Sequence, residues 1–364
     1  MSLQDLGFLL ALIRFPKFGA VRLAKLRGFF PSMAAAFAAG QNELMAAGID
    51  ATTAEQFISL RPKLSPEREL FLIDKYKTKV ILRDDLDYPP LLKQIHDPAA
   101  ALFVRGTWPA VALPSLSVVG SRQATPYAER ASETIVKPLA RAGLVIVSGL
   151  ALGTDALAHE AALQAGGKTI AVLGSGIDDY HIFPSSNRYL ARKIIENNGA
   201  VISEYPPETE PQKIFFPIRN RIIAGMSRGT MVIEAGIKSG ALITARAALE
   251  NGRELFAVPG PFHSPFSEGT NNLIKTGAHP VTEANDVLFA LGLRCFEENK
   301  KNKKPEAGSP AEAAIIQLLS AQPIHVDDLA HATGKNISEI SHLLTLMEMK
   351  GTARHVGNLY YTIN

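Results

Sequence analysis

The sequence predicts an α/β protein with a Rossmann-like, doubly wound and mostly parallel sheet, flanked by a small helical domain and a winged helix. First, short continuous apolar strands alternate with helical segments from about residue 80 onward, which is typical of a parallel sheet covered on both faces. Second, apolar residues recur at helical spacing in the first 79 residues. Third, three helices and a hairpin follow a polar linker, which is typical of a winged helix.

Composition narrows the class of protein further. The chain has 364 residues, of which 46% are hydrophobic and 20% charged, so we expect a globular protein of two or three domains. The net charge of +3 permits a polyanionic partner without requiring one. A single cysteine, Cys295, excludes an internal disulfide and a multi-cysteine metal site, and it indicates a reducing compartment, here the cytoplasm. Asp5 stands where a signal peptide would be positive, and no apolar run reaches the ~18 residues of a membrane span.

Residues 1–79 are expected to form a helical domain similar to SAM or helix-hairpin-helix domains. The stretch FPKFGAVRLAKLRGFF has the form of two helices joined by a tight glycine turn, and residues 46–49 are a possible repeat of it. Such a hairpin can offer backbone N–H groups to a phosphate. A small bundle used only for packing or protein contacts is an equally weighted interpretation.

Residues 80–296 are expected to form the Rossmann-like domain. Its predicted strands are 80–82, 102–106, 116–119, 144–148, 169–173, 200–203, 230–234, 254–258 and 279–281. Its predicted helices are 127–142, 155–165, 188–197, 242–250, 271–276 and 284–291. In this fold a ligand is expected at the carboxyl ends of the parallel strands.

Residues 297–310 are a polar, lysine-rich stretch and are interpreted as a linker. Residues 311–364 follow as the winged-helix domain. Its predicted elements are helices 311–319, 326–333 and 337–349, then strands 352–356 and 359–362. The third helix carries Glu339 and Glu348 and little positive charge, so a protein contact is at least as well supported as DNA recognition.

Three successive strands of the predicted sheet end in glycine and small polar residues. The segments are Gly120-Ser121-Arg122, then Gly149 with Gly153-Thr154-Asp155, then Gly174-Ser175-Gly176-Ile177-Asp178. Glycine lets the backbone approach a ligand, and free N–H groups, a hydroxyl and a guanidinium together hold a phosphate. Because strand carboxyl ends meet at one edge, the three segments predict a phosphate-binding rim.

The stretch from Gln212 to Ala245 combines cations with aromatic rings. It contains Lys213, Arg219, Arg221 and Arg228 beside Phe215 and Phe216, and Ser239-Gly240-Ala241 opens the helix that follows. Cations beside flat apolar rings suit a single-stranded nucleic acid, whose backbone is anionic and whose bases are unstacked. A basic surface loop ahead of a core strand is the alternative.

No catalytic constellation is predicted. Glu234 could act as a base beside a phosphate site, but a structural pairing with Arg219 or Arg221 is favoured. The histidines show no metal-ligand spacing, and the sequence has no Walker loop, no G-x-S-x-G elbow and no G-x-G-x-x-G fingerprint at its first rim segment. We therefore expect no metal and no cofactor.

Several of these motifs, in order, resemble the DNA-processing protein A (DprA/Smf) family from about residue 80 to residue 292. They are Val119-Gly120-Ser121-Arg122, Ser148-Gly149-Leu150-Ala151, Gly153-Thr154-Asp155, Phe216-Pro217, Arg219-Asn220-Arg221-Ile222-Ile223-Ala224-Gly225, Lys238-Ser239-Gly240 and Val258-Pro259-Gly260. The resemblance implies a bacterial, non-enzymatic protein of natural transformation. Such a protein binds and protects incoming single-stranded DNA, loads the RecA recombinase onto it, and forms a homodimer through the Rossmann-like domain.

The resemblance also implies roles for individual residues. Gly120, Ser121 and Arg122 would hold a DNA phosphate, Phe216 would stack a base, and Lys213 would contact the backbone. The remaining expected DNA-binding residues are Gly149, Gly153, Arg219, Asn220, Ser239 and Gly240.

A nucleotide-binding enzyme is the competing hypothesis. The phosphoribohydrolases of the lysine-decarboxylase-like family share a related sheet and carry a P-G-G-x-G-T motif. Residues 235–240 occupy the comparable place and lack that motif, which favours the binding protein.

Overall fold

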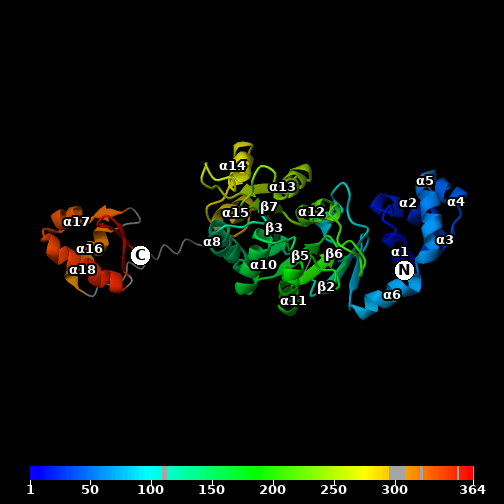
Figure 1. Ribbon diagram of the computed structural model, residues 1–364, viewed down its shortest axis with the longest axis horizontal. Coiled ribbons are helices and arrows are strands. Elements are labelled where there is room, and N and C mark those ends of the chain that lie inside the picture. Colours follow the sequence, from blue (N-terminus) through cyan, green and yellow to red (C-terminus); the bar gives the residue numbers. More distant parts are fainter. Residues whose placement is uncertain (109–112, 295–308, 320–322, 351, 364) are drawn as a thin grey trace. The chain divides into compact units, whose positions relative to one another are not determined.

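The computed structural model describes residues 1–108, 113–294, 309–319, 323–350 and 352–363. The chain divides into two compact units, Met1–Cys295 and Phe296–Asn364 (Figure 1). The helical segment and the large sheet both belong to the first unit, so a domain boundary near residue 79 stays a prediction. No helix in the described part of the chain is both long and apolar enough to cross a membrane.

Short helices fill the N-terminal segment, as predicted. They are α1 Leu3–Arg14, α2 Ala20–Phe29, α3 Met33–Ala38, α4 Gln41–Ala46, α5 Ala51–Leu60, the 3₁₀ turn η1 Arg61–Lys63 and α6 Pro66–Lys75. Gly19 caps the start of α2, and Gly48, at φ +86°, turns the chain between α4 and α5. A cluster of rings holds the helices together: Phe15, Phe18 and Phe57 pack with centroids 4.8 to 5.6 Å apart.

Within the described residues, nine strands form the central sheet in the order β1-β2-β6-β5-β4-β3-β7-β8-β9. Their bounds are β1 Lys79–Leu82, β2 Ala101–Gly106, β3 Ser115–Val119, β4 Val145–Ser148, β5 Thr169–Leu173, β6 Ala200–Ser203, β7 Gly229–Val232, β8 Glu254–Ala257 and β9 His279–Pro280. The strands from β3 to β9 pair in parallel, while β1 and β2 form an antiparallel edge. The predicted mostly parallel sheet is confirmed.

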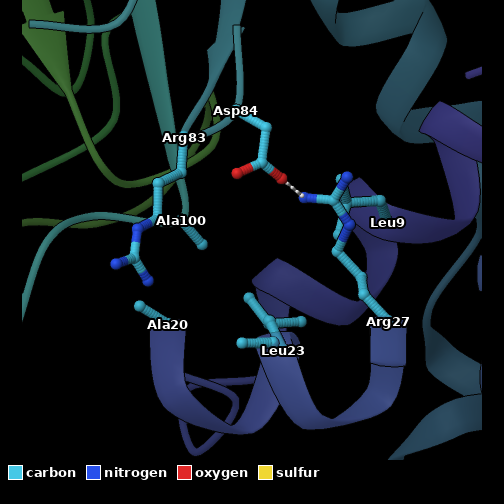
Figure 2. Close-up of a pocket in the computed structure, with 8 residues that line it drawn as sticks. Leu9, Ala20, Leu23, Arg27, Arg83, Asp84 and Ala100 are labelled. Carbon is cyan, nitrogen blue, oxygen red and sulfur yellow. Dashed lines mark hydrogen bonds and ion pairs between the residues drawn. The ribbon is translucent and has the colours of Figure 1, made fainter. Parts of the chain in front are cut away.

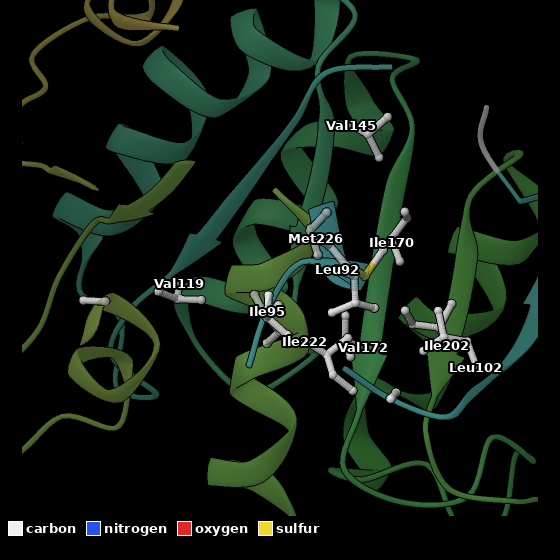
Figure 3. Close-up of a cluster of buried hydrophobic side chains, with 14 of the residues drawn as sticks. Leu92, Ile95, Leu102, Val119, Val145, Ile170, Val172, Ile202, Ile222 and Met226 are labelled. Atoms are coloured by element: carbon white, nitrogen blue, oxygen red, sulfur yellow. The ribbon is translucent and has the colours of Figure 1, made fainter. Parts of the chain in front are cut away.

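Helices cover both faces of the sheet (Figure 1). In chain order they are α7 Pro90–Lys93, α8 Pro126–Ala131, η2 Ser132–Val136, α9 Lys137–Arg141, α10 Thr154–Gln164, η3 Ser185–Asn187, α11 Arg188–Glu196, α12 Phe215–Met226, α13 Ala241–Glu250, α14 Glu268–Lys275 and α15 Ala284–Ala290. Strand β4 shows why helices are needed on both faces of the sheet. Val145 and Val147 join one apolar cluster, which includes Ile222 of α12 (Figure 3), and Ile146 joins another. A strand with both faces apolar must be buried on both sides.

Two helical features differ from expectation. The predicted helix 127–142 is interrupted by the π-turn η2, just before Pro138, whose ring nitrogen cannot donate to the preceding turn. Helix α12 was not predicted, because its sequence was interpreted by its cations and aromatic rings and, as the alternative, as a basic surface loop. Pro217 lies in the first turn of α12, where no intrahelical partner for an N–H is required.

The second unit is a winged helix, as predicted. It contains α16 Pro310–Leu318, β10 Ile324–His325, α17 Val326–Thr333, α18 Ile337–Met349, β11 Ala353–Gly357 and β12 Tyr360–Ile363. The strands pair in the order β10-β12-β11, so the short strand β10 is an addition to the predicted hairpin. Ile315, Leu329, Ile340 and Leu344 are fully buried in its core.

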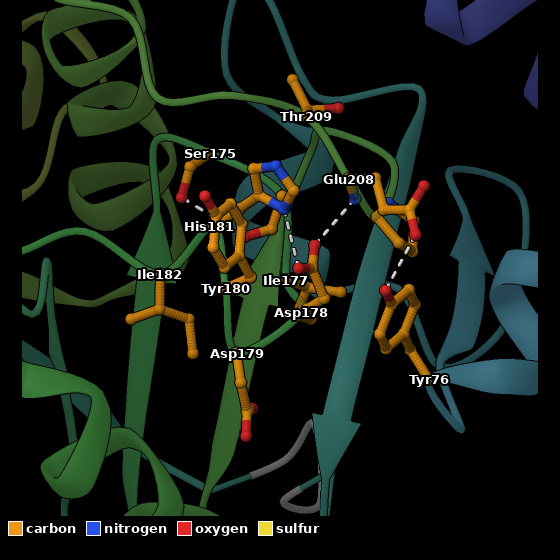
Figure 4. Close-up of polar contacts among 12 residues, drawn as sticks. Tyr76, Ser175, Ile177, Asp178, Asp179, Tyr180, His181, Ile182, Glu208 and Thr209 are labelled. Carbon is orange, nitrogen blue, oxygen red and sulfur yellow. Dashed lines mark hydrogen bonds and ion pairs between the residues drawn. The ribbon is translucent and has the colours of Figure 1, made fainter. Parts of the chain in front are cut away.

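A polar cluster ties the N-terminal helices to the chain that follows β6 (Figure 4). Glu208 accepts hydrogen bonds from the Tyr76 hydroxyl at 2.8 Å and from Arg68 at 2.9 Å. The Tyr76 hydrogen bond is the largest of the contacts that lower the pKa of Glu208 to about 2. The Asp178 carboxylate accepts from the Glu208 N–H at 2.7 Å and contacts His181 Nδ1 at 2.7 Å.

A second contact between the helices and the sheet surrounds a small hollow of about 160 Å³ (Figure 2). Leu9 and Leu23 line it from the helices, and Arg27 pairs with Asp84 across it at 2.9 Å. Like the Glu208 cluster, this contact joins the helical segment to the part of the chain that carries the sheet.

The buried His159 ring in α10 leads us to expect that the stability of the protein depends on pH. Thr169 Oγ1 donates to the Ile146 carbonyl at 2.7 Å and therefore accepts from His159 Nδ1 at 2.6 Å. The other ring nitrogen, Nε2, is buried and has no hydrogen-bond partner in the described structure. Burial, together with the charge of Arg219, lowers the pKa of His159 from 6.5 to about 3.

Between those two pKa values the unfolded chain binds more protons than the folded chain. The stabilisation from a neutral His159 is therefore complete above pH 6.5 and is lost as the pH falls toward about 3. We expect the free energy of unfolding, measured by urea titration from about pH 7 to about pH 4, to fall more steeply in the wild type than in His159→Gln. Equal slopes in the two proteins would contradict this.

Candidate nucleic-acid interface

A groove of about 830 Å³ lies at the carboxyl ends of β3 and β7, near the predicted rim. Strands β4, β5 and β6 lie to one side of β3, and β7, β8 and β9 lie to the other. The chain therefore reverses its direction of winding between β3 and β7. Ligands of doubly wound sheets bind at such a switch point, so the topology and the groove agree.

The loop from β3 to α8 forms one wall of the groove and is held at two backbone positions. The Ser121 N–H donates to the Glu234 carbonyl at 2.7 Å, and the Thr154 N–H donates to the Ser121 carbonyl at 3.0 Å. A Cβ on Gly120 would lie 2.6 Å from Thr154 Oγ1, so only glycine fits there. Gly153 has φ +74°, a conformation that favours glycine. The loop is thus fixed while the Arg122 side chain stays exposed.

Glu234 holds the same loop and does not pair with an arginine. Its carboxylate accepts from the Thr125 N–H at 3.0 Å and from the Thr125 hydroxyl at 2.6 Å, and it is 3% exposed. The favoured pairing of Glu234 with Arg219 or Arg221 was wrong. Arg221 instead pairs with Asp97 and Glu204. A carboxylate occupied in this way fixes the first turn of α8.

Helix α12 presents Phe216 to the groove. Its ring lies with its centroid 5.8 Å from Arg122 Cζ and 5.6 Å from the Phe183 ring. Phe215, one residue earlier, stacks on Tyr205 at 4.2 Å and is not among the groove-lining residues. The two neighbouring rings therefore have different environments, and Phe216 is the one available to a ligand.

Arg219 forms the floor of the groove and is 4% exposed. Its guanidinium donates to the Gly149 carbonyl at 2.7 Å and to the Val172 carbonyl. Burial lowers the pKa of Arg219 to about 10 although the charge of Asp155 opposes this, and burial raises the pKa of Asp155. Arg219 is therefore a structural cation beneath the site.

The glycines of two of the three predicted rim segments lie away from the groove, although Asp155 of the second segment lines it. Gly149 and Gly153 do not line the groove. A Cβ on Gly149 would lie 2.7 Å from the Arg219 guanidinium, and one on Gly153 would lie 2.4 Å from the Ser121 carbonyl, so both pack beneath it. Residues 174–178 do not line it either, and Gly174 instead leaves room for the Phe216 ring. A glycine after a strand serves close packing as readily as ligand binding.

The opposite wall comes from the start of α13 and the loop before it. Ser239 and Gly240 line the groove there, and Asn220 Nδ2 reaches the Gly240 carbonyl at 3.5 Å. Several other lining residues were not predicted as site residues, among them Phe183, Lys238, Pro265 and Phe266. Lys238 belongs to the Lys238-Ser239-Gly240 motif of the family resemblance. The other three residues lie in segments distant in sequence, where no motif indicated a binding site.

The groove carries more positive than negative charge. Its described lining includes Arg122, Lys213, Arg219 and Lys238 against the single carboxylate of Asp155. Arg122, Lys213 and Lys238 are exposed, and within the described residues none of them lies within ion-pair distance of an acid. Within the same residues no group of three or more His, Cys, Asp or Glu side chains is arranged to hold a metal ion. Free cations beside an accessible ring suit an anionic chain with flat bases.

Comparisons with known proteins identify the family of this chain. Residues 79–292 match the family model for DNA recombination-mediator protein A, and residues 299–358 match that of the DprA winged helix domain. Protein Smf from Escherichia coli is 39% identical over 314 residues, which cover 85% of this chain and 83% of that protein.

Two solved structures are similar as well. The X-ray structure of DNA processing protein A from Streptococcus pneumoniae has a TM-score of 0.66 at 33% identity, covering 78% of this chain and 97% of that one. A DNA processing protein A from Helicobacter pylori, solved for its single-stranded DNA binding mode, has a TM-score of 0.53 at 30% identity. That match covers 59% of this chain and 96% of the Helicobacter chain.

Proposed function

This chain belongs to the DNA recombination-mediator protein A family, and on that premise we propose that it binds single-stranded DNA in the groove at β3 and β7. The observation that carries the proposal is the pairing of Arg122 with Phe216 at 5.8 Å from two distant segments. One side chain can neutralise a phosphate while the other stacks a base.

The proposed contacts follow from where each residue lies. Direct contacts are assigned to residues that line the groove, which are Gly120, Ser121, Arg122, Lys213, Phe216, Asn220, Ser239 and Gly240. Gly149, Gly153 and Arg219 are assigned a supporting role, because they pack beneath the groove or form its floor. This divides the sequence-based set into residues that touch DNA and residues that shape the groove.

We further propose that the protein acts in natural transformation in the cytoplasm, that it is a homodimer, and that it protects incoming DNA and loads RecA without catalysing a reaction. Family membership supports these roles. The engagement of the Glu234 carboxylate by Thr125 also supports a non-catalytic role. That carboxylate is not free to act as the base that a nucleotide-cleaving enzyme would need.

Binding of labelled single- and double-stranded oligonucleotides by the full-length protein tests the proposal. Each cation that neutralises a phosphate contributes about −0.7 to the slope of log affinity against log salt concentration. The three free cations therefore give a slope of about −2, which corresponds to about a 20-fold loss of affinity between about 50 and about 200 mM salt. The single strand should bind more tightly than the duplex at both concentrations, because stacking on Phe216 requires an unpaired base. Equal affinity for both, or no salt dependence, would contradict the groove as described.

A further inference from the structure

We propose that a bound single strand continues out of the groove onto a second surface, the α11 track, formed by Tyr180, Phe183, Arg188, Tyr189 and Lys193. This inference rests on the proposed function, because it extends the same strand. It adds a second set of base contacts, on the other side of the loop that leads from β5 into α11.

Exposed aromatic rings mark the α11 track. Tyr180 is 78% exposed, Phe183 48% and Tyr189 67%, all within ten residues of chain. Rings of this size usually bury most of their surface in a folded protein. Exposed apolar groups gathered at one place indicate an interaction site.

Each tyrosine of the track lies beside a cation. Arg188 Cζ is 5.6 Å from the Tyr180 ring centroid, and Lys193 Nζ is 4.6 Å from that of Tyr189. The same arrangement joins Arg122 and Phe216 in the groove. A cation at the ring supplies charge for a phosphate, while the remaining ring surface is available for a base.

The track is continuous with the groove at Phe183. This ring lines the groove and lies 5.6 Å from the Phe216 ring. Three residues earlier, Tyr180 lines a separate hollow of about 570 Å³, whose charged lining consists of Lys75, Lys77 and Arg105 together with Asp178 and Asp179. The loop that carries both rings therefore separates two hollows, and each ring serves one of them.

Hydrogen bonds hold this loop in place. Arg188 donates to the Ile182 carbonyl at 3.4 Å and to the Tyr180 carbonyl. The Asp178 carboxylate contacts His181 Nδ1 at 2.7 Å, beside Tyr180 (Figure 4). Rings on a fixed loop lose little conformational freedom on binding, which favours a strand that stacks on them in sequence.

Oligonucleotide length separates the track from the groove. We compare the binding of oligo(dT) of about 6 and about 16 nucleotides, because the shorter one fills only the groove. The test variant combines Tyr180→Leu with Tyr189→Leu, and the matched control combines Tyr180→Phe with Tyr189→Phe. Leucine removes the ring and keeps an apolar side chain, whereas phenylalanine keeps the stacking surface.

The leucine variant should bind the short oligonucleotide like the wild type and the long one at least about fivefold more weakly, since one lost stack costs about that much. The phenylalanine variant should keep both affinities. As a second variant, Lys193→Gln should weaken only the long oligonucleotide and lower its salt slope by about 0.7.

The results distinguish an error in the proposed α11 track from an error in the proposed groove. If the wild type binds both lengths and the leucine and glutamine variants match it at both, the track is wrong and the groove stands. If the wild type binds neither length, the proposed function and the track both fall. Phe29→Ala removes an exposed ring from α2, outside the track, and should leave both affinities unchanged; a loss equal to that of the leucine variant would also overturn the track.

Discussion

Replacing Arg219 with alanine is expected to lower the free energy of unfolding by about 3 to 5 kcal/mol, as measured by urea denaturation. Arg219 is 4% exposed and donates to the Gly149 and Val172 carbonyls. Its removal leaves both acceptors without that donor and leaves Asp155 buried beside no positive charge. Uncompensated buried polar groups account for most large losses of stability.

Two controls test whether the loss of stability comes from the buried position of Arg219 beside Asp155. Arg22→Ala breaks an exposed ion pair with Asp50 and should cost less than about 1 kcal/mol. Adding Asp155→Asn to Arg219→Ala should restore part of the loss, because the second change removes the stranded carboxylate charge. A loss in Arg219→Ala no larger than that in Arg22→Ala would contradict the structural role assigned to Arg219.

Replacing Phe216 with alanine is expected to weaken single-stranded DNA binding by about 1 to 3 kcal/mol, the contribution of one base stacked on a ring. Phe216 is half-buried in the groove, with Arg122 on one side and Phe183 on another. Fluorescence anisotropy with a labelled oligonucleotide measures the loss directly.

The neighbouring ring provides the matched control for stacking. Phe215→Leu changes the side chain that stacks on Tyr205 and does not line the groove, so it should leave the affinity near that of the wild type. Phe216→Tyr keeps a stacking surface and should also bind normally. If Phe215→Leu weakens binding as much as Phe216→Ala, the two rings do not have the separate roles described.

Sequence reasoning succeeded where a local pattern has a single structural solution. Apolar runs such as 169–173 can only be buried strands here, and their alternation with helices specified a doubly wound sheet. The placement of Gly120 to Arg122 at the ligand edge followed from the rule that strand ends meet at one edge, whereas Phe216 was expected there from its basic and aromatic surroundings and from the family resemblance.

Sequence reasoning failed where the role of a residue depends on which face of its helix or strand is buried. Because helix α12 was not predicted, the sequence could not show that Phe216 faces the groove while Phe215 faces Tyr205. Nor could it show that Arg219 is buried whereas Lys213 is exposed, because a cation's charge does not reveal its neighbours. Phe183 and Phe266 reach the groove from distant loops, and such contacts leave no local pattern.

The salt dependence of single-stranded DNA binding tests the central claim most directly. Arg122→Ala should lower the slope of log affinity against log salt by about 0.7, because one phosphate contact is lost. Phe216→Ala should weaken binding at an unchanged slope. Arg228→Ala removes an exposed cation of the same sequence stretch that does not line the groove, and it should bind like the wild type. If Arg122→Ala keeps the wild-type affinity and slope while Arg228→Ala loses both, the groove at β3 and β7 does not hold the DNA backbone.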